Sequence, residues 1–213
     1  MFTAPLVLLL LLTVVLVWES VRANVAPGAR SDWPWRLQLL DMEALGSLLA
    51  VAAGAVLARA QYARTVRPYL GWRGGWVREH LKGGAQAWRM GLLNGGQHIA
   101  AVESYDFLVV PAGADAPDAA ARWTGLPGAA AELTALGLTV AEDFQLVDIS
   151  PGFPLVSTGS YETVLVGAFS KRFLERVDAL YVRVRVVDVV GDSHERIGDC
   201  LKGARATAFA PLD

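Results

Sequence analysis

Two apolar runs within the first sixty residues constrain this chain more than any other feature. They extend from Ala4 to Trp18 and from Ala44 to Ala58, on either side of a more polar stretch. About 20 apolar residues span the hydrocarbon core of a bilayer, so each run approaches the length of one membrane helix. We therefore expect a transmembrane helical hairpin over residues 1–64, with helices at about 3–20 and 42–64.

A cleavable signal peptide is the alternative interpretation of the first run. Signal peptides begin with a basic segment and end at a cleavage site made of small residues. Here no Lys or Arg precedes the run, and the stretch from Trp18 to Arg22 is a poor cleavage context. The sequence therefore favours retention of the first run as an anchor.

Small residues recur at every fourth position along the second run, at Gly46, Ala50, Gly54 and Ala58. Such a stripe lets another helix backbone approach closely, and close packing drives helix association in lipid. The partner is the first helix, a second copy of the chain or another membrane subunit. Chance spacing in an Ala-rich helix is the plain alternative.

The positive charges near the helix ends predict the orientation. Between the runs, three arginines are offset by four carboxylates, whereas six basic residues follow the second run with only Glu79 to oppose them. The six are Arg59, Arg64, Arg67, Arg73, Arg78 and Lys82. Basic residues gather on the cytoplasmic side of membrane helices, and each attracts anionic lipid by about 1 kcal/mol. We expect a plasma-membrane protein whose termini and soluble domain are cytoplasmic.

Aromatic residues near the ends of membrane helices typically lie at the headgroup level. The sequence predicts an outer belt of Trp18, Trp33 and Trp35, and an inner belt of Tyr62, Tyr69, Trp72 and Trp76.

About 150 residues follow the hairpin, a usual size for one soluble domain. The net charge of −2 argues against nucleic acid as a partner, because phosphate binding needs a basic surface. With Cys200 as its single cysteine, the chain cannot form an intramolecular disulfide, which suits a reducing compartment. The domain must therefore be stabilised by packing.

Beyond residue 84 the hydrophobic period becomes two, as in β-strands. The clearest strand covers 181–190, where Val182, Val184 and Val186 alternate with Arg183 and Arg185. Further strands are expected over 87–93, 99–110, 144–149, 161–169 and 194–201, with turns at 94–96, 151–154, 158–160 and 191–193. A short helix is expected over 127–136 and a helical turn over 171–177.

These elements predict a mainly-β soluble domain over 85–213, an antiparallel Ig-like β-sandwich with a short helical insertion. The Gly-rich segment 65–84 is interpreted as a juxtamembrane linker of flexible turns, because it lacks the strand-to-helix context of a phosphate-binding loop.

Three short motifs carry a family resemblance: Arg67-Pro68-Tyr69-Leu70, Asn94-x-Gly96 and Asp188-x-x-Gly191. Over roughly residues 60–205 the chain resembles a group of uncharacterised bacterial membrane-anchored proteins with N-terminal transmembrane helices and a C-terminal Ig-like β-sandwich. The resemblance implies a fold and no chemistry. Asn and Gly suit backbone positions with positive φ, and Asp caps turns with its side chain. We therefore interpret these Asn, Asp and Gly residues as turn residues.

The sequence offers little catalytic chemistry. A metal site from His194 and Cys200 is disfavoured, because strand residues six apart are separated by roughly 20 Å. A nucleophile pair of Cys200 with His98 has no supporting motif, so a structural cysteine is favoured. We expect no catalytic residue, no cofactor and no metal.

These observations favour a membrane-anchored interaction or accessory module that is not an enzyme. The lipid bilayer and a protein of unknown identity are its expected partners. The recognition surface is expected over 111–137 and at the hairpin turn 191–194. One alternative is an assembly subunit of a larger membrane complex that packs through the second helix. A membrane-tethered hydrolase is the least favoured.

Overall fold

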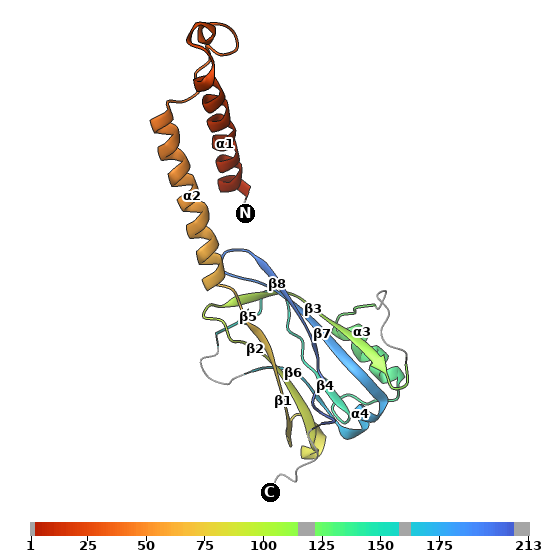
Figure 1. Ribbon diagram of the computed structural model, residues 1–213. Coiled ribbons are helices and arrows are strands. Elements are labelled where there is room, and N and C mark those ends of the chain that lie inside the picture. Colours follow the sequence, from red (N-terminus) through yellow and green to blue (C-terminus); the bar gives the residue numbers. More distant parts are fainter. Residues whose placement is uncertain (1–2, 115–121, 158–162, 207–213) are drawn as a thin grey trace. The chain divides into compact units, whose positions relative to one another are not determined.

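The chain divides into two compact units in a computed structural model, Met1–Thr65 and Val66–Asp213 (Figure 1). The structure describes residues 3–114, 122–157 and 163–206. The predicted turn at 158–160 and part of the predicted recognition surface therefore lie outside the described residues.

The first unit consists of helices α1, Thr3–Asn24, and α2, Met42–Thr65, with a short 3-10 helix η1, Pro27–Ser31, between them. At about 1.5 Å per residue, the two long helices extend roughly 33 and 36 Å, enough to cross the hydrocarbon core. Both are also apolar enough to do so. The two predicted apolar helices are confirmed. Helix α1 continues four residues beyond its predicted end, where the polar side chains of Arg22 and Asn24 form hydrogen bonds with residues of the preceding turn.

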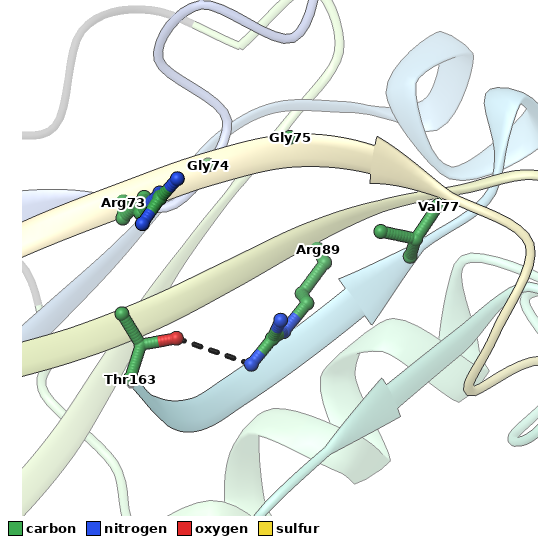
Figure 2. Close-up of a pocket in the computed structure, with 6 residues that line it drawn as sticks. All are labelled: Arg73, Gly74, Gly75, Val77, Arg89 and Thr163. Carbon is green, nitrogen blue, oxygen red and sulfur yellow. Dashed lines mark hydrogen bonds between the residues drawn. The ribbon is translucent and has the colours of Figure 1, made fainter. Parts of the chain in front are cut away.

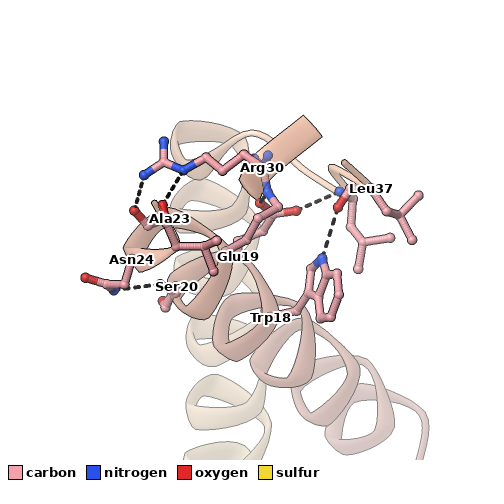
Figure 3. A network of polar contacts seen from close by, with 10 residues as sticks. Trp18, Glu19, Ser20, Ala23, Asn24, Arg30 and Leu37 are labelled. Atoms are coloured by element: carbon pink, nitrogen blue, oxygen red, sulfur yellow. Dashed lines mark hydrogen bonds and ion pairs between the residues drawn. The ribbon is translucent and has the colours of Figure 1, made fainter. Parts of the chain in front are cut away.

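A polar network holds the connection between the helices against the end of α1 (Figure 3). The carboxylate of Glu19 is only 2% exposed and accepts hydrogen bonds from Arg22 Nε at 2.7 Å and from the Leu39 N–H at 2.6 Å. Arg30 donates to the carbonyls of Ala23, in the last turn of α1, and of Val25, the residue after it. Cationic side chains stabilise such helix ends. Together, the Glu19 and Arg30 contacts hold the segment between α1 and α2 against the end of α1.

The packing of α1 on α2 leaves the small-residue stripe uncovered. Leu12 of α1 and Leu45 and Ala52 of α2 form the buried contact. All four stripe residues are exposed within this unit, and a Cβ added to Gly46 or Gly54 would meet nothing within 4 Å. Within this unit, the stripe is therefore not part of the buried contact with α1.

The second unit contains two four-stranded antiparallel sheets (Figure 1). One has the order β1-β2-β6-β4 and the other β5-β3-β7-β8. The strands are β1 Leu70–Val77, β2 Ala87–Asn94, β3 Ala100–Pro111, β4 Phe144–Leu146, β5 Pro154–Leu155, β6 Val164–Phe169, β7 Val177–Val187 and β8 Ser193–Asp199. The helices are η2 Lys82–Gly84, α3 Leu126–Ala135 and α4 Lys171–Arg176. This confirms the prediction of a mainly-β, antiparallel domain with a short helical insertion.

Both sheets contribute to one core. Alternate residues of β7, including Val182 and Val184, are fully buried, and Phe107 of β3 joins them from the same sheet. Phe169 of β6 and Phe144 of β4 enter the same core from the other sheet. The alternation follows from the two-residue period of strands, which directs successive side chains to opposite faces.

The prediction of a linker over 65–84 is wrong for its central part, which forms the edge strand β1 and pairs with β2 along its whole length. Trp72 and Trp76 pack against the core of this domain, so they do not belong to an inner aromatic belt. The two-residue period of the strand puts Trp72 and Trp76 on one face with Leu70, and pairing with β2 compensates for the weak strand propensity of glycine.

Candidate functional site

Strands β1 and β8 are end strands of their respective sheets, and residues of both line the same pockets. The indole of Trp72 on β1 covers Gly198 on β8 so closely that a Cβ added there would lie 2.4 Å from the ring. This boundary between the two edge strands is the seam, and it is the candidate site.

Main-chain hydrogen-bonding groups face the seam from both strands. The N–H of Cys200 donates to Leu180 at 2.8 Å, and bonded pairs alternate along an antiparallel ladder. The main-chain groups of Glu195 and Ile197 therefore point away from β7. On β1, the Gly95 N–H donates to the Tyr69 carbonyl, so these two residues form a bonded pair. Because bonded pairs alternate, the main-chain N–H and C=O of Trp72, three residues along, point away from β2. No described strand pairs with these groups.

Two adjoining pockets open along the seam and share Arg196. One has a volume of about 380 Å³ and lies between the segment before β1 and the start of β8. The other has a volume of about 500 Å³ and lies around Trp72 and Gly198. Trp72 also supplies a buried indole N–H that has no acceptor within the described part of the chain. Buried donors are normally paired, so this N–H, which lies against Gly198, is an unusual feature of the seam.

The charged residues of the seam leave an excess of positive charge. Glu195 is paired with Arg185 at 2.9 Å, and the Asp199 carboxylate accepts the Leu201 N–H at 2.9 Å. Arg67, Arg196 and Lys202 line the same pockets, are exposed, and have no ion pair among residues 3–114, 122–157 and 163–206. The seam therefore suits an acidic ligand.

The three motifs of the family resemblance meet at one end of the seam. Asn94 is buried, and its Oδ1 accepts from the N–H groups of Gly96 at 3.0 Å and Tyr69 at 3.3 Å. Its Nδ2 donates to the carbonyls of His98 and Leu155. A Cβ at Gly96 would lie 2.9 Å from the Arg67 carbonyl oxygen, so only glycine fits there without a shift.

The third motif forms the turn between β7 and β8. Asp188 Oδ1 accepts from the N–H groups of Val190 and Asp192, and Gly191 has a φ of +84°. Burial opposes ionisation of Asp188, but the hydrogen bond from His194 and those from Asp192 and Val190 outweigh it and lower its pKa. His194 contacts Asp188 at 2.9 Å and also lines the seam.

The basic residues predicted to face the inner leaflet are distributed over both units. Arg59 and Arg64 belong to the last turns of α2, and Arg67 lines the seam. Arg73 lies on β1, and Lys82 pairs with Glu142 at 3.1 Å. Arg78 is exposed after β1. Within the β domain, Arg67, Arg73, Arg78 and Lys82 thus lie on different segments.

Cys200 lacks the environment of a nucleophile. Its side chain is fully buried, and this burial raises the pKa of the thiol well above its usual range. Reactive cysteines are accessible and have lowered pKa values. Within the described residues, no group of three His, Cys, Asp or Glu side chains is arranged to hold a metal ion.

Sequence reasoning missed Arg196, Gly198 and Lys202 as residues of the seam. The residues of β8 show only weak alternation, and nothing in the sequence indicates which strand becomes the neighbour of β1. A glycine within a strand can mark a close approach by another group, and Gly198 was the one available signal.

No protein-family model, curated protein or solved structure matches this chain.

Proposed function

We propose that this protein is a membrane-anchored interaction module whose β domain binds an extended, acidic segment of a protein partner along the seam. In this proposal α1 and α2 cross the plasma membrane, and both termini and the β domain are cytoplasmic. The orientation is supported by the six basic residues that follow the second apolar run. No catalytic step is part of the proposal.

The finer fold assignment, an Ig-like sandwich, is supported by strand order. Constant-type Ig domains pair strands A-B-E-D in one sheet and C-F-G in the other. If β1 to β4 are taken as A to D and β6 to β8 as E to G, the observed sheets have this order. Strand β5 then becomes an additional edge strand beside β3.

The observation that carries the interaction proposal is the pair of outer strand edges, those of β1 and β8, that line the same pockets and have no described strand paired with them. Exposed edges pair readily with another chain, and proteins commonly protect them with Pro or Lys. Strand β1 is eight residues long and contains neither. An added strand would satisfy main-chain groups on the seam, and its acidic side chains would meet Arg67 and Arg196.

Site-specific photo-crosslinking in the source membranes tests this proposal. A photoreactive residue at Ile197, which is 48% exposed on β8, should form a discrete adduct with one protein. The matched control is Val140, which is 56% exposed and lines neither pocket of the seam. Ile197→Pro should abolish adduct formation at a second seam position, Lys202, because it removes an outward N–H without removing a bond to β7. Equal adducts at Ile197 and Val140 would contradict the proposal.

A second candidate function is that of an assembly subunit in a membrane complex. It is favoured by the exposure of Gly46, Ala50, Gly54 and Ala58, none of which lies in the buried contact with α1. A Cβ added at Gly54 meets no atom within 4 Å, so Gly54→Leu should reduce complex size while the β domain stays folded. Unchanged complex size in mild detergent would remove this candidate. The hydrolase hypothesis has no comparable support, because Cys200 is buried.

A further inference from the structure

A third pocket lies on the outer face of the sheet that contains β1 and β2 (Figure 2). It has a volume of about 340 Å³ and is lined by Arg73, Gly74, Gly75, Val77, Arg89 and Thr163. Among the described residues that line it are two guanidinium groups and no carboxylate.

The strand register creates the pocket. Arg73 pairs with Gly91 and Arg89 pairs with Gly75, so each arginine faces a glycine across the two strands. The two arginines are therefore diagonal neighbours on one face, a separation of about 7–8 Å between such positions. A Cβ added to Gly75 would meet nothing within 4 Å, which leaves the space beside Arg89 open.

Arg89 is held in place but incompletely paired. Its Nη2 donates to the Thr163 hydroxyl at 3.1 Å, as Figure 2 shows. Its Nε–H is buried and has no acceptor in the described part of the chain, and no carboxylate there forms an ion pair with it. Guanidinium groups bind phosphate through parallel N–H bonds, and a buried donor without an acceptor is costly. An anion with several oxygens would pair with the part of this guanidinium that lines the pocket.

From this geometry we propose that the pocket binds a phosphate monoester group, with Arg89 as the principal ligand and Arg73 as the second positive charge. A tetrahedral dianion offers oxygens to two guanidinium groups on different strands, which a single planar carboxylate does less well. The group belongs either to an anionic lipid headgroup or to a soluble phosphate compound. This site lies on the opposite face of β1 from the seam pockets, although Gly74 lines both this pocket and one of those, and it does not depend on a protein partner.

Calorimetric titration of the full-length protein in neutral detergent tests the proposal. The probes are inorganic phosphate, dihexanoyl phosphatidic acid and, as a headgroup without a monoester, dihexanoyl phosphatidylcholine. The wild type should bind the first two probes and not the third. Tighter binding of the phosphatidic acid by about tenfold or more would identify a lipid source, and equal affinities would identify a soluble one.

Two variants and one control make the test specific. Arg89→Gln should weaken binding by about tenfold or more, and Gly75→Val should abolish it by filling the pocket without a clash. Arg176→Gln removes the same charge from an exposed position on α4 outside the pocket and should change the affinity less than twofold. Absence of binding to both phosphate probes would overturn the proposal. So would wild-type affinity in Gly75→Val, or equal losses in Arg89→Gln and Arg176→Gln.

Discussion

Asn94→Asp should destabilise the β domain strongly at neutral pH. The wild-type amide donates from Nδ2 to the carbonyls of His98 at 2.8 Å and Leu155 at 3.1 Å. A carboxylate donates to neither, and each lost bond that leaves a buried partner costs about 1–3 kcal/mol. Because Oδ1 keeps the bonds from Tyr69 and Gly96, we expect a net loss of about 2–4 kcal/mol in the free energy of unfolding.

The same variant should recover part of this loss in acid. Burial near two carbonyls raises the folded-state pKa of the new carboxyl above its unfolded value near 3.9. The protonated form can donate one hydrogen bond, so the deficit relative to wild type shrinks as pH falls toward about 4 and is largest above the raised pKa. Urea unfolding of the full-length protein in detergent, followed by tryptophan fluorescence at both pH values, measures this. A deficit below about 0.5 kcal/mol, or one independent of pH, would refute the reasoning.

Three glycine and turn substitutions give further tests of the packing. Gly198→Val should lower the free energy of unfolding by about 1–3 kcal/mol, because the valine side chain collides with Trp72. The control Gly75→Val should be neutral or stabilising in the same unfolding assay, because a Cβ there meets nothing within 4 Å. Equal effects of the two substitutions would contradict the seam contact. Asp188→Asn should cost about 1–2 kcal/mol at pH 7 through weaker bonds to His194 and the turn. Because Asp188 has a lowered folded-state pKa, the stability it contributes is present above its unfolded value near 3.9 and is lost as pH falls through the folded pKa. Unfolding curves of wild type and Asp188→Asn should therefore converge below about pH 4, and a constant gap would count against this role.

Local hydrophobic periodicity was sufficient to predict much of the fold. The alternating valines of β7 and the long apolar runs of α1 and α2 specify their elements without reference to the rest of the chain. Helix α3 begins one residue before the predicted start, with Pro127 in its first turn.

Features that depend on tertiary pairing could not be predicted in this way. Strand β1 has three glycines and weak propensity of its own, and it becomes a strand through its pairing with β2. The seam joins Trp72 to Gly198, and the outer pocket joins Arg89 to Thr163, across long sequence separations. Alternation indicates which face of a strand is buried, but it does not indicate which edge stays unpaired.

Thiol labelling in intact cells tests the orientation of the membrane anchor most directly. Two single substitutions, Ser31→Cys in the loop between α1 and α2 and Glu132→Cys on α3, place an exposed thiol in each unit. The native Cys200 is buried and should stay unlabelled in both. With a membrane-impermeant maleimide, we expect Ser31→Cys to react in intact cells and Glu132→Cys to react only after lysis. Labelling of Glu132→Cys in intact cells would contradict a cytoplasmic β domain.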